Sequence, residues 1–89
     1  AVCFADGGAT VNLPQTHTLL GDTYEIFINP LTVGTVTIEP GTAAGGQIDN
    51  LGIGQNMKVG ALQPFERGVK LICMGGTALG IQWAIIRGA

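Results

Sequence analysis

The residues best suited to covalent chemistry in this 89-residue chain are His17 and two cysteines, Cys3 and Cys73, because the sequence contains no serine. A cysteine nucleophile needs a histidine partner and electropositive surroundings. Both cysteines instead lie between apolar neighbours, in Val-Cys-Phe and Ile-Cys-Met, where a free thiol behaves as a small hydrophobic side chain. We therefore expect two buried thiols without a disulfide, and a solvated loop histidine.

The sequence gives little indication of a metal site, a phosphate-binding loop or a catalytic pair of carboxylates. His17 is the only histidine and no C-x-x-C spacing exists, so a metal site lacks ligands. The glycines from Gly52 to Gly60 have no G-K-[ST] ending, which a phosphate-binding loop needs. A glycosidase needs two facing carboxyls, but most acids here fall at turns or strand ends, where they bind local backbone or keep an edge soluble. The acids are Asp6, Asp22, Glu25, Glu39, Asp49 and Glu66. A pair formed in space or between subunits stays open, but we expect no cofactor, no metal and no enzymatic activity.

Two aromatic residues, Trp83 and Tyr24, could form a platform for stacking a sugar. Trp83 alternates with Ile81 and Ile85, and Tyr24 alternates with isoleucines in the segment Thr23–Asn29. Residues that alternate with isoleucine share a face of a strand with it. We therefore expect both aromatics to be in the core, or in the case of Trp83 at a subunit contact.

The composition favours a permanent assembly. Hydrophobic residues make up 46% of the chain and charged residues only 11%, against about 25% charged in an ordinary soluble domain. A single domain of this size, residues 1–89, buries only roughly 60 to 65% of its unfolded surface. The net charge is -2 and the four bases are scattered, so nucleic acid is not an expected partner. The uncharged run from Leu71 to Ile86 is short for a spanning helix and contains glycines, so we expect no membrane span.

The pattern of short apolar segments predicts an all-β fold. Glycines and prolines divide the chain into pieces of strand length, and no window shows a sustained helical period. We expect about seven short antiparallel strands forming a small sandwich or barrel. The expected strands are Val2–Ala5, Ala9–Leu13, Thr23–Asn29, Val33–Glu39, Gln47–Asp49, Met57–Val59 and a terminal hairpin from Val69 to Ile86 that turns at Gly75–Gly76.

The terminal hairpin is apolar on both faces. A half-exposed antiparallel strand normally alternates apolar with polar residues, but here only Lys70 and Gln82 are plain solvent positions. We therefore expect a second copy of the chain to cover one face. The predicted subunit interface consists of Val69, Leu71, Ile72, Cys73, Met74, Ile81, Trp83, Ile85 and Ile86. Loops expected to contact another partner contain Thr42, Ala43, Ala44, Asn50, Ile53 and Gln55.

An ordered series of motifs spans nearly the whole chain. The series comprises V-x-L-P at Val11–Pro14, G-x-x-Y-x-I at Gly21–Ile26, G-T-V-T-I at Gly34–Ile38, I-D at Ile48–Asp49, and V-x-L-I with W-x-I-I at Val69–Ile72 and Trp83–Ile86. It resembles a small β domain that recurs in bacteriophage fibre, tailspike and virion-surface proteins. The resemblance implies a homotrimer around a three-fold axis, without cofactor or catalytic residues. Two segments depart from the family pattern, Gly52–Lys58 and Leu62–Arg67, and we expect any surface specialisation there.

The resemblance leaves two functions open. The first is a complete small virion protein, a trimeric capsid decoration or cement protein. Such a protein would be assembled in the host cytoplasm and bind the major capsid protein at the virion surface. The alternative is the C-terminal trimerisation or receptor-binding tip of a tail fibre or tailspike, attached to a fibre shaft and contacting a host-surface glycan. A length of 89 residues leaves no room for an anchoring region and a shaft, which favours the decoration protein or an excised fibre tip.

Overall fold

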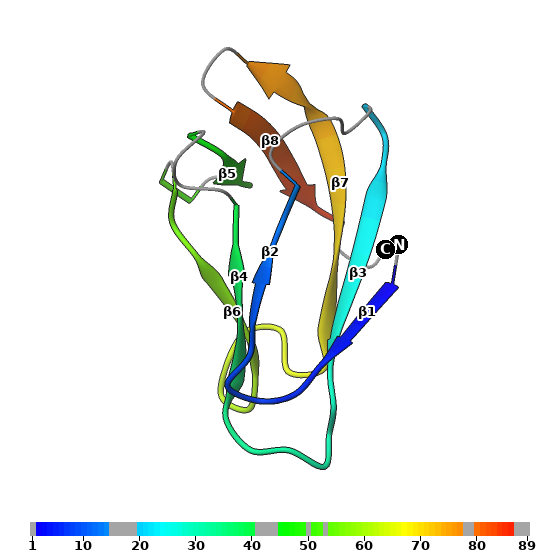
Figure 1. Ribbon diagram of the computed structural model, residues 1–89, viewed down its shortest axis with the longest axis vertical. Coiled ribbons are helices and arrows are strands. Elements are labelled where there is room, and N and C mark those ends of the chain that lie inside the picture. Colours follow the sequence, from blue (N-terminus) through cyan, green and yellow to red (C-terminus); the bar gives the residue numbers. More distant parts are fainter. Residues whose placement is uncertain are drawn as a thin grey trace.

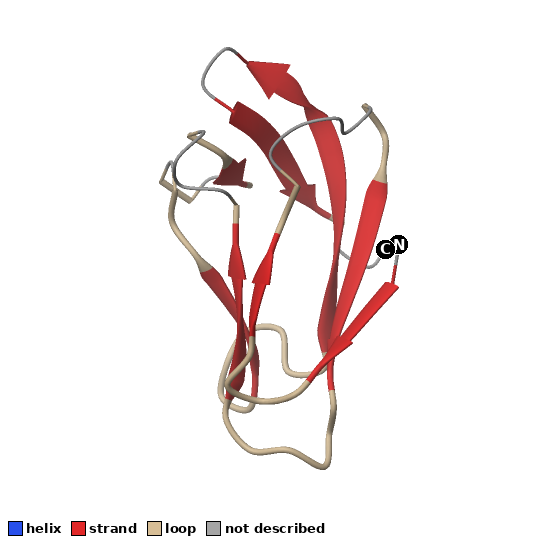
Figure 2. Cartoon of the chain, viewed as in Figure 1, coloured by secondary structure: helices blue, strands red, loops and turns tan. Residues whose placement is uncertain are grey.

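The computed structural model describes residues 2–14, 20–40, 45–49, 51–52, 54–77 and 80–86. These residues form eight strands and no helix (Figure 2), which confirms the predicted all-β class. The strands are β1 (Val2–Ala5), β2 (Thr10–Asn12), β3 (Thr23–Ile28), β4 (Thr35–Glu39), β5 (Gln47–Ile48), β6 (Met57–Gly60), β7 (Gly68–Thr77) and β8 (Gly80–Ile85).

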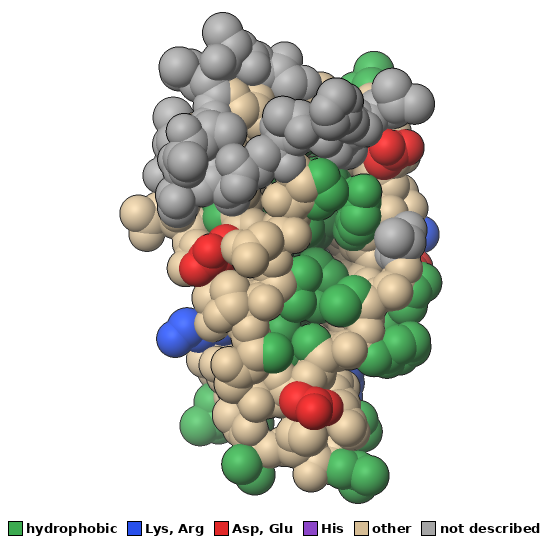
Figure 3. Space-filling model, in the orientation of Figure 1, with side chains coloured by type: hydrophobic (Ala, Val, Ile, Leu, Met, Phe, Trp, Pro, Cys, Tyr) green, Lys and Arg blue, Asp and Glu red, His purple; other side chains and the backbone are tan. Residues whose placement is uncertain are grey.

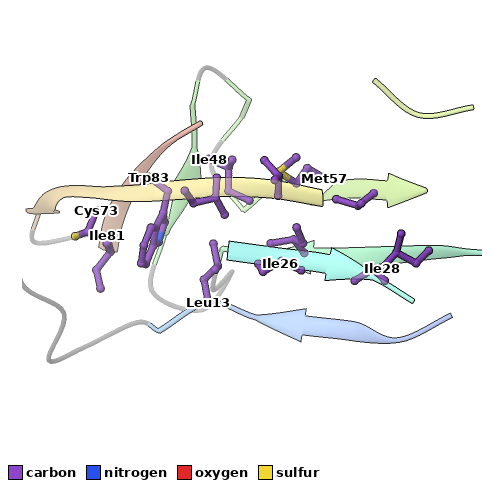
Figure 4. Packing of buried hydrophobic residues seen from close by; sticks show 13 residues of the cluster. Leu13, Ile26, Ile28, Ile48, Met57, Cys73, Ile81 and Trp83 are labelled. Atoms are coloured by element: carbon purple, nitrogen blue, oxygen red, sulfur yellow. The ribbon is translucent and has the colours of Figure 1, made fainter. Parts of the chain in front are cut away.

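The strands form two sheets with one core between them. The larger sheet has the order β1-β3-β7-β8-β5, and the smaller has the order β2-β4-β6 (Figure 1). One cluster of buried side chains takes residues from both sheets (Figure 4). The described strands thus form a small sandwich rather than a closed barrel.

Half of the described strand pairings are parallel, so the expectation of antiparallel strands throughout was wrong. β1 pairs with β3, β2 with β4, and β5 with β8 in parallel, whereas β3–β7, β4–β6 and β7–β8 are antiparallel. The sequence signals at Asp6-Gly7-Gly8 and Asn29-Pro30 mark turns that carry the chain from one sheet to the other. A strand of one sheet, the turn and the next strand in the other sheet together form a β-arch. The arches β1–β2 and β3–β4 lie against each other (Figure 1), so β1 runs parallel to β3 and β2 parallel to β4.

The turns of the two arches are held together at Gly7. Its backbone N–H donates to Oγ1 of Thr32 at 2.8 Å. A Cβ at position 7 would overlap the carbonyl oxygen of Val33, so the approach requires glycine. Asn29 adds to the contact, because its backbone N–H donates to the carbonyl of Ala5 at 2.8 Å and its Nδ2 donates to Asp6 Oδ1 at 3.2 Å.

The first strand of the terminal hairpin is longer than predicted. β7 continues through Gly75 and Gly76 to Thr77, so the expected reversal at these glycines was wrong. The pairing of β7 with β8 shifts register between Cys73 and Gly76, which is a β-bulge. Gly75 has a φ of 105°, and a glycine with positive φ serves a bulge as well as it serves a turn.

The core consists of the inward residues of the strands. Val36 and Ile38 of β4 are fully buried, as their alternation predicts. Trp83 is 2% exposed, and Tyr24 packs against it edge to face with ring centroids 5.3 Å apart and an interplanar angle of 81°. Trp83 is therefore in the core as predicted, while Tyr24 is partly buried and packs against the core. The buried hydrophobic residues are Leu13, Ile26, Ile28, Val36, Ile38, Ile48, Met57, Val59, Val69, Leu71, Cys73, Ile81 and Trp83.

The two cysteines lie in different surroundings. Both are free, and Cys73 is buried as expected, but Cys3 is exposed. The expectation of a buried Cys3 was wrong because β1 is an edge strand, with β3 as its only neighbour in the sheet order.

Candidate functional site

The candidate site is the outer face of the five-stranded sheet, opposite the core. Since successive side chains of a strand point to opposite faces, the neighbours of buried residues lie here. Pairing between the strands places them in rows across the sheet, such as Phe4 beside Phe27 and Phe27 beside Gly68. The large apolar residues most exposed on this face are Val2 (55%), Phe4 (77%), Met74 (57%) and Ile86 (40%).

One ion pair lies in the middle of this outer face. Lys70 and Glu25 are opposite each other on β7 and β3, with Nζ and Oε1 3.5 Å apart. On one side is an aromatic patch, Val2, Phe4 and Phe27. On the other is an aliphatic patch, Ile72, Met74, Ala84 and Ile86. The ion pair therefore separates two apolar surfaces on the same sheet.

Contacts between three strands hold the side chains of the aromatic patch in place. The rings of Phe4 on β1 and Phe27 on β3 are stacked, with centroids 5.5 Å apart and planes 24° apart. The Phe27 ring also covers Gly68 on β7, where a Cβ would overlap it. An aromatic ring that covers a glycine on the neighbouring strand shields backbone that has no side chain of its own.

The aliphatic patch lies where β7 and β8 run side by side. Ile72 is directly opposite Ala84, and the backbone N–H of Ile86 donates to the carbonyl of Lys70 at 2.8 Å, which continues the pairing beyond the end of β8. Ile72 and Ala84 are half-buried by their neighbours in the sheet, while Met74 and Ile86 are exposed. The patch is thus an uncharged surface on a continuous hydrogen-bonded hairpin.

The predicted subunit interface is divided between the core and the surface. Its members Val69, Leu71, Cys73, Ile81 and Trp83 are at most 6% exposed within the chain itself. These five are not available to a partner, because alternate residues of both strands point into the sandwich. Ile72, Ile85, Met74 and Ile86 remain at least partly exposed. All of these except Ile85 lie on the outer face, in the aliphatic patch.

The loops predicted to contact another partner can be placed only in part. Thr42, Ala43, Ala44, Asn50 and Ile53 lie outside the described residues, and Gln55 is exposed.

A second apolar surface lies at one end of the sandwich. The sequence predicted surface specialisation at Leu62–Arg67 but not that this surface would be apolar. The tip loops, residues 29–34 and 61–67, lie together at the lower end of the molecule in Figure 1. They carry the most exposed large apolar side chains of the described residues, Leu31 (92%), Val33 (91%) and Leu62 (97%). Figure 3 shows apolar side chains at this end.

Two features of the sequence pointed toward these tip loops. Leu62 begins a segment that departs from the motif series that the sequence otherwise resembles, and the structure gives it a φ of 67°, which is unfavourable for a residue with a side chain. Val33 was expected to begin a strand, but β4 starts at Thr35. A groove between the two loops, with a volume of about 390 Å³, is lined by residues of both, including Pro30, Val33 and Arg67.

Within the described residues, no group of three or more His, Cys, Asp or Glu side chains is placed to hold a metal ion. His17 lies outside them. The described part of the chain has no helix of the length and hydrophobicity that crossing a membrane requires.

No protein-family model, curated protein or solved structure matches the chain. The fold and the surface therefore define the class of protein on their own: an all-β sandwich of two mixed sheets with an apolar outer face.

Proposed function

We propose that the chain is a non-enzymatic structural protein of a bacteriophage virion, in which three copies assemble through the aliphatic patch. The observation that carries the assembly is this uncharged patch around Met74 and Ile86, in a chain with only 11% charged residues. Exposed apolar surface of this kind marks an interaction site. The assignment to a phage particle and the three-fold symmetry rest on the sequence resemblance.

Burial of the aliphatic patch together with the surface around it would supply the energy of assembly. If each subunit loses roughly 1,000 Å² of surface, half of it apolar, about 25 cal/mol per Å² gives on the order of 12 kcal/mol per subunit before the costs of association. The pair Lys70–Glu25 would lie beside the interface and remain solvated, since both side chains are already partly exposed. The buried centre of the interface is then apolar and its rim is polar, as in stable oligomers.

The tip loops would make the second contact, to the major capsid protein. Their exposed side chains Leu31, Val33 and Leu62 are aliphatic, which suits another protein surface. A glycan site is usually built from aromatic platforms and polar groups, whereas the one aromatic residue of the tip loops, Phe65, is half-buried and packs against the core. This observation favours a capsid decoration or cement protein at the virion surface. The alternative, a fibre or tailspike tip that binds a host-surface glycan, takes second place.

Binding to the capsid tests the proposal. The purified chain would be added to capsids of the phage that encodes it, prepared without the chain, and bound copies counted after sedimentation. Decoration predicts saturation at a fixed number of copies per capsid and loss of binding in Leu62→Asp, with trimers retained. Adsorption to host cells without capsid binding would support the fibre tip, and binding to neither would contradict both.

A further inference from the structure

Among the described strands, β1 is the sheet edge that has none of the usual barriers to further strand pairing. Such barriers are short length, charge, proline or a bulge. β5 has two residues, β2 has three and is followed closely by Pro14, and β6 carries Lys58. β1 lies beside β3 at the edge of the sheet (Figure 1), and its four uncharged residues are in unbroken register with β3. Val2, Cys3 and Phe4 are all exposed.

The backbone groups that β1 turns toward this edge can be identified. The carbonyl of Ala5 accepts the N–H of Asn29, so the peptide groups of Ala5 face β3. In a parallel pair the N–H and C=O of one residue point to the same side, and successive residues alternate. Cys3 therefore also faces β3, while Val2 and Phe4 direct both their N–H and C=O groups to the free edge.

We propose that the free edge of β1 pairs antiparallel with β1 of a second copy, across a two-fold axis that passes between the two Cys3 residues. This register sets Val2 opposite Phe4 of the partner subunit, and Phe4 opposite Val2 of the partner subunit. Each of these is a hydrogen-bonded pair, because Val2 and Phe4 carry the outward backbone groups. A two-fold contact of this kind uses the same surface on both copies and closes on itself.

The side chains of β1 are complementary to themselves in this register. Val2 and Phe4 lie on the outer face of the sheet, so each two-fold contact contains two cross-strand pairs of an aromatic with a β-branched residue, a favourable combination. Phe4 already stacks on Phe27, and the pairing joins the two aromatic patches into one apolar surface. β1 carries no charge that would oppose a second copy.

The contact is independent of the trimer proposed above. It uses the edge of β1, whereas the trimer uses the aliphatic patch on β7 and β8. If both contacts form, β1 links subunits of different trimers. Sedimentation separates them: Phe4→Lys should leave trimers, and Ile86→Asp should leave β1-linked dimers.

Cys3 reports directly on the register. In the proposed register Cys3 lies opposite the equivalent cysteine of the second copy, as a non-hydrogen-bonded pair with Cα atoms about 4.5 Å apart. This distance is within the range of about 4.4 to 6.8 Å that a disulfide accepts. Treatment with the azo oxidant diamide, which takes two electrons and two protons from the two thiols, should yield a dimer on non-reducing gels. The dimer should form equally in Cys73→Ser and be absent in Cys3→Ser.

Controls separate paired strands from random collision. In Cys3→Ser/Val2→Cys the introduced thiol lies opposite position 4 of the second copy, two residues away from the equivalent thiol. The Cα atoms of the two introduced cysteines are then about 8 Å apart, too far for a disulfide. This variant should form the dimer at least tenfold more slowly than the wild-type chain. Phe4→Lys should slow Cys3 coupling by at least tenfold while the fluorescence of Trp83 shows that the chain is folded. Val2→Lys gives the same test should Phe4→Lys not fold. The proposal would be overturned if disulfides formed equally fast from cysteines at positions 2 and 3. It would also be overturned if Cys3 formed the disulfide at the wild-type rate in the folded lysine variant.

Discussion

The ring of Phe27 lies over Gly68 on the neighbouring strand, in the place where any other residue would carry its Cβ. The same Cβ would lie 2.8 Å from the backbone carbonyl oxygen of Ile26. Phe27 in turn stacks on Phe4 of the edge strand. The absence of a side chain at position 68 therefore fixes the position of the aromatic patch.

Gly68→Ala should destabilise the fold, because the new methyl group must displace both a ring and a backbone carbonyl. Overpacking of this kind costs about 1 to 3 kcal/mol. Urea unfolding followed by the fluorescence of Trp83 measures the change. Gly52→Ala is the matched control, since a Cβ there would meet only the flexible side chain of Gln55 at 3.0 Å. A cost equal to that of the control would mean that the ring moves aside freely.

Trp83→Phe should be far milder than Trp83→Ala. The Nε1 atom of Trp83 is buried and has no hydrogen-bond partner among the described residues. An unpaired buried donor costs about 1 to 3 kcal/mol, so replacement by phenylalanine removes this penalty while it loses some packing. Truncation to alanine loses the whole contact with Tyr24 and should cost about 3 to 5 kcal/mol. Urea unfolding followed by circular dichroism compares the two variants, and similar losses would imply that the donor is satisfied.

The sequence predicted the buried faces better than the path of the chain. Alternation identified Val36, Ile38 and Trp83 as core residues, because a strand that covers a core must bury every second side chain. The same alternation could not show that the turn at Asp6-Gly7-Gly8 crosses between sheets, since glycines suit an arch and a hairpin equally well. Parallel pairing was missed for this reason.

The candidate site was predicted only in part, for a similar reason. Two apolar faces on the terminal hairpin were evident, but which residues belong to the core depends on the position of the second sheet. The exposure of Leu31 and Leu62 had no signal in periodicity, because both lie in loops. The aromatic patch joins β1, β3 and β7, which are far apart in the sequence.

The two thiols should react at very different rates. Cys3 is exposed, whereas Cys73 is 1% exposed. We expect one thiol per folded chain to react rapidly with a chromogenic disulfide reagent, and the second to react only as the chain unfolds. Phe4→Lys is the suitable background because it removes the proposed β1 contact. Rapid labelling that persists in Cys3→Ser would contradict the burial of Cys73.

Lys70→Ala should change stability very little. The side chains of Lys70 and Glu25 are 45% and 34% exposed, and exposed ion pairs contribute about 0 to 1 kcal/mol. Urea unfolding of Lys70→Ala, Glu25→Gln and the double variant measures the coupling between them. A coupling above about 1 kcal/mol would mean that the pair is shielded from solvent, as it would be inside an interface.

Assembly of three copies through the aliphatic patch can be tested by analytical ultracentrifugation of Ile86→Asp. Asn56→Asp adds the same charge at an exposed position away from the patch and serves as the matched control. To remove the β1 contact, all measurements use the Phe4→Lys background. We expect a trimer for the background chain and for Asn56→Asp, and a monomer for Ile86→Asp at micromolar concentration. A folded monomer in the background chain itself, or a soluble trimer in Ile86→Asp, would contradict this expectation.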